Sequence, residues 1–562
     1  MSPVQRAAPL PRSFHLPWLG EALSAVGLAA LLATPMAVAA LAGPGWSVWA
    51  AMAGGWVAYL AIAWRADAAV AIGALLVWLA TQRMAAALLS PFVPAEEVRH
   101  VLAYKEGLMA ALLLAGAGRL LWRWRQGGPL WRPLLPDLLA LLFLMVVLAH
   151  FVLSEAALAD RLTYLRRWCM PCLLYFAGRA LTPDPSLFLR SLRLFLGLAA
   201  LVAVFGLVER FLLAPAFWMD TVDAVAFYRR QIEAGLIPGQ WLFAYRGLPD
   251  GVFSALPLTV PVRRLVSTFL EPTTLALFLA LALVLALAAQ PERRRPIGWP
   301  LLALALLLAT ALLATLGRAG MLVAIVGGGV LALLALGRGR PWPALAAAIV
   351  LPPLLAALAV TTLPDVPARG QVTALLEWSS AMPAPASPPP AGAPAPSGPA
   401  PTDRPPGSTA EGAARHVWGL REGLRQMAEA PLGLGLGAAG LWSEAPDVGG
   451  ESALGALTAQ LGVFGLGFWL LFLLSLAAGL LLPSLGDAKE ERGPHWRMWR
   501  GLAAGLLGLL IASWFSESAA GVTGTAAYYL FAGWGVALAG GLPLPLPMPY
   551  HPSRQATQGL AR

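Results

Sequence analysis

Charged residues are scarce in this sequence. Asp, Glu, Lys and Arg make up only 12% of its 562 residues, whereas hydrophobic residues make up 58% and the mean hydropathy is +0.69. A typical soluble globular chain carries about 25% charged residues, so this composition excludes an ordinary soluble domain. The 22 tryptophans are typical of side chains that anchor helices where hydrocarbon meets lipid headgroups. We therefore expect a polytopic membrane protein.

Potential metal ligands are also few. The chain has only two cysteines, Cys169 and Cys172, which excludes a four-thiolate zinc site. The six histidines are scattered without the spacing of a metal site, and we expect neither a metal nor another cofactor. Because the two cysteines flank Pro171 in an apolar run, we expect either packed thiols or a local disulfide.

Apolar runs of spanning length recur along the whole sequence and predict an all-α fold, a bundle of about 12 to 14 membrane-spanning helices. The runs lie near residues 23–42, 46–64, 68–89, 105–122, 134–153, 164–181, 192–213, 264–289, 299–316, 319–336, 343–362, 453–482, 500–515 and 526–542. The first run resembles a signal peptide with Ala37-Val38-Ala39 as its cleavage site, but the many later runs favour a retained anchor.

The distribution of basic residues predicts the orientation. With the N-terminus in the cytoplasm, more than half of the 39 basic residues and fewer than a third of the 29 acidic ones fall on the cytoplasmic side. The same asymmetry accounts for the net charge of +10, so we expect no nucleic-acid partner. Spans then occupy residues 1–213, 263–362 and 453–542, and residues 543–562 form a cytoplasmic tail. Two long outward loops, 214–262 and 363–452, separate the three groups of spans.

The stretch 263–290 combines a polar rim with a membrane span. Arg263 and Arg264 precede a short polar cluster with Glu271 and Pro272, and an uncharged run follows. Ionisable groups at the edge of hydrocarbon are costly to keep and therefore indicate function. Arg318 lies between two further spans in a very short turn. It either marks the membrane boundary or joins the arginines of this rim in a pyrophosphate clamp, because guanidinium groups match phosphate oxygens.

The two loops differ in composition. Residues 214–262 interleave aromatic and charged residues, which is typical either of a segment lying flat on the membrane or of a path for a sugar chain. Residues 382–407 are rich in Pro, Ala and Ser and predict a tether without chemistry. A helix is expected over 408–430, with Val417, Leu420, Leu424 and Met427 on one face.

The charged face of this helix has two readings. It is either merely solvated, or it contributes phosphate- or sugar-binding residues from the set Arg415, His416, Arg421 and Arg425. The pattern Gly435-x-Gly437-x-x-Gly440 matches a dinucleotide-binding motif, but no strand precedes it. We interpret it as a tight turn back onto the membrane.

Four segments together resemble a known family. They read RLVSTFLEPTTLALF, ATLGRAGML, HVWGLREGLRQMAEAPLGLGLGAAG and GESALGALTAQLGVFGLGF. Their order, spacing and topology are similar to those of the O-antigen polymerase and ligase superfamily, membrane enzymes that join lipid-linked glycans outside the bacterial inner membrane. The resemblance covers about residues 263–468. Ligases of this family carry a His-Asn pair where this chain has Glu451 and Ser452, a departure that favours a polymerase of the exopolysaccharide type.

The resemblance implies a site and its partners. Glu451 would be the catalytic base, and Arg264 and Arg318 would stabilise the departing pyrophosphate. Substrate contacts would come from Arg263, Glu271, Ser452 and the candidates on the 408–430 helix. The donor and acceptor would be glycans linked to undecaprenyl pyrophosphate, and the other partners would be membrane lipids, a flippase and a chain-length regulator. A ligase, and a transporter of lipid-linked glycan, are the alternative functions; the absence of an internal repeat disfavours the transporter.

Overall fold

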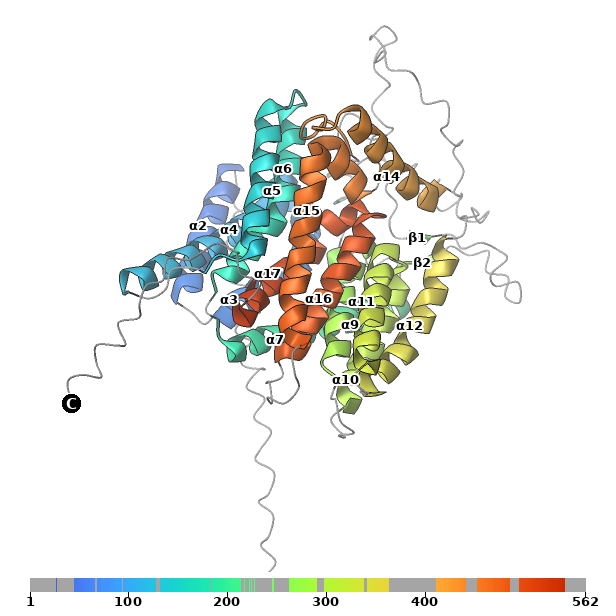
Figure 1. Cartoon of the computed structure of the whole chain (residues 1–562). Helices are drawn as coiled ribbons and strands as arrows, with labels where there is room; N and C mark the ends of the chain where they lie inside the picture. Colours follow the sequence, from blue (N-terminus) through green and yellow to red (C-terminus); the bar gives the residue numbers. More distant parts are fainter. Residues whose placement is uncertain are drawn as a thin grey trace, which may run out of the picture.

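The computed structural model describes residues 45–65, 68–92, 95–127, 132–181, 183–213, 245–246, 262–290, 298–337, 341–362, 411–440, 452–485 and 495–540, and a few isolated positions between them. Within these ranges the chain forms fourteen α-helices (Figure 1). They are α2 (Gly45–Arg65), α3 (Ala68–Leu89), α4 (Ala95–Arg125), α5 (Leu135–Leu153), α6 (Leu158–Arg179), α7 (Pro185–Phe211), α9 (Pro272–Ala288), α10 (Gly298–Thr315), α11 (Arg318–Leu336), α12 (Pro341–Thr362), α14 (Glu411–Glu429), α15 (Ala453–Leu485), α16 (His495–Ser513) and α17 (Val522–Ala539). Short 3-10 turns η1 (Ser90–Phe92), η3 (Ser267–Phe269) and η4 (Glu517–Ala520) and a pair of two-residue strands, β1 (Tyr245–Arg246) and β2 (Val262–Arg263), complete the description.

The predicted all-α membrane bundle is confirmed. Every predicted span except the first coincides with one of these helices; the first, 23–42, lies almost wholly outside the described residues. Six described helices are long and apolar enough to cross a membrane: Ala68–Leu89, Val101–Arg125, Leu135–Leu153, Pro185–Phe211, Arg318–Leu336 and Ala453–Leu485. Three shorter apolar helices, including α9, lie among them.

Helix α9 is the centre of the bundle. All of its residues except Thr273 are buried, and it packs against α7, α10, α11, α16 and α17. Its sequence alternates Leu and Ala with no charge, so it is apolar on every side, which is typical of a helix surrounded by others. The uncharged run that follows the polar rim in the sequence is thus the most enclosed helix of the described chain.

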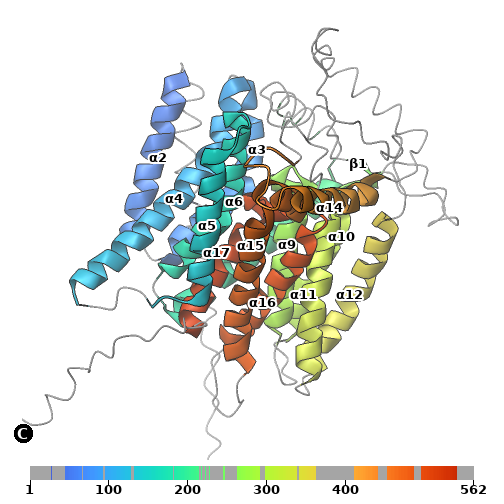
Figure 2. The ribbon, with the colours of Figure 1, turned by 45° about the horizontal axis from the view of Figure 1, so that its top comes forward.

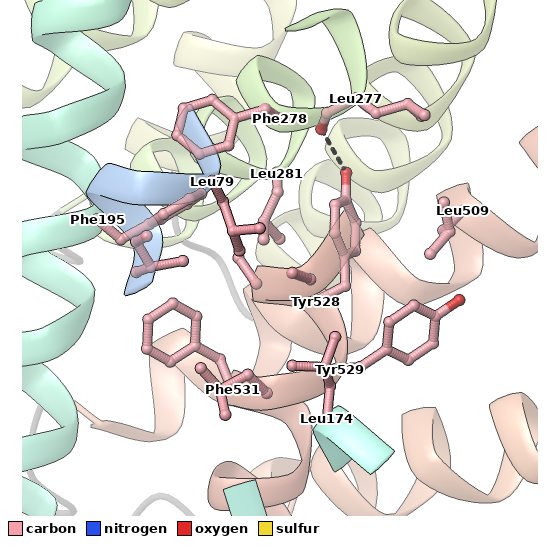
Figure 3. Close-up of a cluster of buried hydrophobic side chains, with 14 of the residues drawn as sticks. Leu79, Leu174, Phe195, Leu277, Phe278, Leu281, Leu509, Tyr528, Tyr529 and Phe531 are labelled. Carbon is pink, nitrogen blue, oxygen red and sulfur yellow. Dashed lines mark hydrogen bonds between the residues drawn. The ribbon is translucent and has the colours of Figure 1, made fainter. Parts of the chain in front are cut away.

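Aromatic and aliphatic side chains from six helices meet around α9 (Figure 3). Phe278 of α9 packs edge-on against Phe195 of α7, with ring centroids 5.1 Å apart. Tyr528 of α17 donates its hydroxyl hydrogen bond to the carbonyl oxygen of Leu277 at 3.0 Å. A buried tyrosine hydroxyl without a partner would be costly, so this bond fixes α17 against α9 as well as satisfying the polar group.

Small residues allow α6 and α17 to approach closely. A Cβ atom added to Gly178 would collide with the carbonyl oxygen of Leu530, and one added to Gly533 would collide with that of Tyr175. The two glycines therefore face the opposite backbone at one crossing. Such close contacts are a main source of helix association in membranes, because lipid is as apolar as the side chains.

Helix α15 is broken at Gly462, whose φ is 60° and ψ is −156°. The preceding loop fills the break: Leu434 N–H donates to Ala459 O at 2.8 Å, and Gly435 N–H donates to Gln460 O at 3.1 Å. Gly433, Gly435, Gly437 and Gly440 all have positive φ, between 84° and 101°. This confirms a tight turn in place of a nucleotide motif, because left-handed backbone is what glycine permits.

Helix α14 lies across one end of the bundle, roughly perpendicular to the spans (Figure 2). This confirms a helix over most of 408–430, with residues 408–410 outside the described part. Among residues 417–429, where burial is described, Gly419 and Gly423 are buried, and a Cβ on Gly423 would collide with the backbone of Gly455 in α15. Val417 and Leu424 of the predicted apolar face are exposed, whereas Leu420 of the same face packs against the buried core beside the glycines.

From the close α6–α17 crossing we predict that a single added methyl group lowers stability. We expect Gly533→Ala to lower the stability of the purified protein by about 1 to 3 kcal/mol, because the backbones must separate. Gly329→Ala is the matched control, since a Cβ there meets nothing within 4 Å. Thermal unfolding in detergent, followed by circular dichroism, measures both; equal midpoints would show that the crossing tolerates a wider spacing.

Candidate functional site

The polar rim lies where α9, α11, α15 and α17 begin, which we call the site end of the bundle. Strand β2 pairs Arg263 with Tyr245, bringing the first long loop to the rim. Leu265 N–H then donates to Ala314 O at 2.9 Å, and Arg264 Nε donates to Thr315 O at 2.9 Å. These two bonds hold Arg264 against the turn between α10 and α11.

Arg318 lies on the other side of the same turn, as the first residue of α11. The hydroxyl of Thr315 donates to Leu312 O at 2.6 Å and accepts from Gly317 N–H at 3.0 Å, which fixes the turn. Gly317 has no room for a side chain because Ala276 of α9 is too close. The two predicted catalytic arginines, 54 residues apart in sequence, are therefore anchored to one turn on the first turns of α9.

Backbone strain is concentrated in these segments. Within the described residues, the non-glycine residues with positive φ are Ser267 (48°), Leu270 (51°) and Leu316 (51°). Two precede Glu271 and the third precedes Arg318. Such conformations cost about 1 to 3 kcal/mol each and persist where surrounding structure enforces them, often at functional sites. The rim is thus held in a conformation that its own sequence does not favour.

Side-chain hydrogen bonds to neighbouring helices hold this strained backbone in place. Ser267 Oγ donates to Val202 O of α7 at 2.9 Å, and Thr268 Oγ1 donates to Ala80 O of α3 at 2.6 Å. The Ser267 N–H points to the carboxylate of Glu209, which is fully buried in α7, at 3.5 Å. The segment before α9 is therefore fastened to two neighbouring helices.

Glu271 is engaged within the protein. Its carboxylate forms an ion pair with Arg83 of α3 and accepts a hydrogen bond from Thr274 Oγ1 at 2.6 Å. Glu271 was predicted to contact substrate. In the structure its carboxylate contacts Arg83 and Thr274. Glu271 thereby links α3 to the start of α9 and draws a further cation into the rim.

Several other charges at the site end were not predicted from the sequence. Glu106 of α4 lies 3.5 Å from Lys105 Nζ and 3.6 Å from Arg166 of α6. Its Oε2 is buried and has no hydrogen-bond partner among the described atoms, a state that needs an explanation such as a ligand or water. Arg83, Lys105, Glu106 and Arg166 all lie inside predicted spans. The rule that intramembrane charges indicate function would have identified them.

A buried carboxylate joins α6 to η4. Glu517 of η4 is 4% exposed, forms an ion pair with Arg167 and accepts a hydrogen bond from the hydroxyl of Tyr164 at 3.0 Å. The Arg167 guanidinium also lies over the Tyr164 ring, 5.6 Å from its centroid. Both interactions use Oε1 of Glu517, and its buried Oε2 has no hydrogen-bond partner among the described atoms.

Ser452 is fully buried and caps α15. Its Oγ accepts from Gly455 N–H at 3.0 Å and donates to Trp514 O, at the end of α16, at 2.7 Å. Ser452 was predicted to contact substrate, and the structure gives it this structural role. Trp514 lies three residues before Glu517. The short segment 514–517 therefore links Ser452, which bonds Trp514, to Arg167, which pairs with Glu517.

The remaining predicted residues divide into two groups. Arg425 is exposed on α14 and bonds Glu422 and Glu429, each at 2.5 Å, and its hydrogen bonds hold the pKa of Glu422 below the ordinary value. Arg421 is exposed on the same helix. Glu451 and the side chains of Arg263, Arg415 and His416 lie outside the described residues.

The described charges give the site end a cationic character. Arg83, Lys105, Arg166, Arg167, Arg264 and Arg318 gather there with the carboxylates of Glu106, Glu209, Glu271 and Glu517. Guanidinium groups in a partly dehydrated rim can bind a phosphate group and stabilise charge that develops on it. The sequence matches no protein-family model, and it matches no curated protein significantly.

The Glu517 pair predicts a large loss of stability. We expect Glu517→Gln to cost about 3 kcal/mol, because Arg167 would keep a buried charge without its counter-ion. Glu155→Gln is the matched control, an exposed carboxylate at the same end. Thermal unfolding of both variants in detergent tests this; a Glu517→Gln midpoint equal to that of the control would show that Arg167 finds another partner.

Proposed function

We propose that this chain is a glycan polymerase of the bacterial inner membrane, with its site end in the periplasm. It transfers a growing chain from undecaprenyl pyrophosphate to another lipid-linked unit. One observation carries the proposal: Arg264 and Arg318 share one strained turn beside the buried start of α9. Those two segments are among the four whose sequences together resemble the O-antigen polymerase and ligase superfamily.

The arginines fit the leaving group of this reaction. Pyrophosphate gains negative charge as its bond to the sugar breaks, and a guanidinium stays charged at any physiological pH. The bond from Arg264 Nε to Thr315 O uses one edge of that guanidinium and restricts its orientation. A donor that is already oriented stabilises developing charge without reorganising during the reaction.

The proposed chemistry is a single displacement. A hydroxyl oxygen of the acceptor glycan attacks the anomeric carbon of the donor, and its proton passes to the Glu451 carboxylate. The bond between the anomeric carbon and the pyrophosphate oxygen breaks, and its electron pair leaves with the lipid pyrophosphate. Arg264 and Arg318 neutralise that charge. Ser452 provides the cap of α15, so the start of this helix does not depend on Glu451 for a capping group.

Transport is an alternative function, because transporters also contain broken helices. In such proteins the break lines the substrate cavity. Here the break at Gly462 is occupied by the chain itself, since Leu434 and Gly435 donate to the carbonyls of Ala459 and Gln460, and Val463 N–H donates to Pro431 O at 2.9 Å. The two predicted catalytic arginines, Arg264 and Arg318, also lie where spans begin or end, away from the middle of the bundle. Both observations favour an enzyme.

Lipid-linked intermediates in a deletion strain test the proposal. Loss of a polymerase should leave single repeat units on the lipid at the periplasmic face, and restoring the gene should restore long chains. Finished long chains remaining on the lipid would instead identify a ligase. Single units trapped at the cytoplasmic face would identify a flippase.

Arg318→Lys tests the phosphate contact. The substitution keeps a positive charge but removes the two-pronged donor, so we expect polymer synthesis to fall at least about tenfold while the protein still folds. Arg65→Lys, at an exposed position ending α2, is the control and should leave activity unchanged. Normal polymer from the Arg318→Lys strain would make Arg318 a marker of the membrane boundary.

Glu451→Gln tests the base. The amide keeps the size of the side chain but cannot accept a proton, so single-turnover transfer should fall by about 10² to 10⁴ with donor binding retained. Stability should change little, because Ser452 supplies the cap. Transfer at the wild-type rate would remove Glu451 from the mechanism, and weaker donor binding with normal transfer would assign it to substrate positioning.

A further inference from the structure

Helix α14 uses a narrow glycine face to contact the bundle. Gly419 and Gly423, one turn apart, are buried, and Gly423 faces the backbone of Gly455 in α15. Because glycine has no side chain, the two helices cross closely and the neighbouring side chains of α14 project to either side. Val417 and Leu424 therefore remain exposed, while the half-buried Leu420 packs against the core.

One side of α14 carries an apolar stripe made of Val417, Leu420, Leu424 and Met427. Val417 is 55% exposed and Leu424 is 42% exposed, while Leu420 and Met427 are half-buried. The other side carries Glu422, Arg425 and Glu429, which are joined by ion pairs. Separation of an exposed apolar stripe from a charged side is typical of helices that lie in a membrane interface.

The stripe continues onto the outside of α15. After α14, Leu432 and Leu434 are 66% and 41% exposed, and Pro431 O accepts from the N–H of Val463. Val463 and Phe464 are exposed in turn, as are Leu471 and Leu474 farther along the same helix. These last four residues belong to a helix that is long and apolar enough to cross a membrane, so their exposed side chains face lipid.

The length of α15 indicates how deep in the membrane α14 lies. From Val463 to Leu485 the helix rises about 34 Å, which matches the hydrocarbon thickness of a bilayer. The break at Gly462 then lies near the edge of the hydrocarbon, and the C-terminal end of α14 is tied to this point through Pro431. Figure 2 shows α14 lying across the bundle at this end, an orientation that keeps the whole helix near that level.

We propose that the apolar stripe of α14 is inserted into the boundary between headgroups and acyl chains of the leaflet at the site end, as an interfacial anchor. The occupant of this face is lipid, because the stripe is continuous with the lipid-facing side of α15. The charged side of Glu422, Arg425 and Glu429 faces water. The inference concerns the placement of α14 and holds for any reaction at the rim.

Site-directed fluorescence tests the proposal in the full chain. Leu424→Cys and Glu429→Cys place a thiol on the stripe and on the charged side of the same helix, and each is labelled with an environment-sensitive NBD dye. Labelling of the unmodified chain, which contains Cys169 and Cys172, gives the background. The proteins are reconstituted in phosphatidylcholine vesicles and quenched either by lipid spin-labelled near the headgroup or by aqueous iodide.

At position 424 we expect the shallow spin-labelled lipid to remove about half of the fluorescence and iodide to have little effect, since interfacial helices bury about 5 to 10 Å into this zone. Position 429 should show the reverse. Strong iodide quenching at both positions would overturn the proposal and leave α14 solvated. Protection of position 424 from both quenchers, with cross-linking between chains through Leu424→Cys, would replace lipid by a second copy. Thermal unfolding like that of the unmodified chain ensures that each labelled variant is folded.

Discussion

The enclosure of α9 constrains the rest of the structure. Its backbone is satisfied internally and its side chains are apolar on every side, so it can be surrounded by helices. The segment that enters it has no such regular bonding and must obtain partners elsewhere. Ser267, Thr268 and Arg264 therefore bond to carbonyls of α7, α3 and the α10–α11 turn. Those bonds hold a strained backbone and bring charged residues from distant parts of the chain to one end.

Much of this fold follows from the sequence. Uncharged runs of spanning length identify helices because a membrane leaves the backbone few alternatives, and nearly every predicted run became a helix. The rim was also predictable: Arg264 and Arg318 were expected to be close because both flank spans at the same end, and the turn at Thr315 joins them. The pattern of apolar runs and the alternating direction of the spans are sufficient to predict that these two arginines lie at the same end.

Partner choice was not predictable in the same way. Arg83, Lys105 and Arg167 could be recognised as charges inside spans, but their partners Glu271, Glu106 and Glu517 depend on which helices become neighbours. Apolar periodicity also did not predict the contact that α14 makes with α15 through Gly423. It weighs side-chain hydrophobicity, whereas Gly423 contributes by lacking a side chain. Close backbone approach between helices has little signal in a single sequence.

The filled break in α15 has a consequence for biogenesis. Synthesis proceeds from the N-terminus, so the strand of chain that supplies the donors, residues 431–435, leaves the ribosome before the helix that needs them. These residues must lie beside the break when α15 packs into the bundle, because the carbonyls of Ala459 and Gln460 would otherwise lack partners. Placement of the turn and packing of α15 are therefore coupled events.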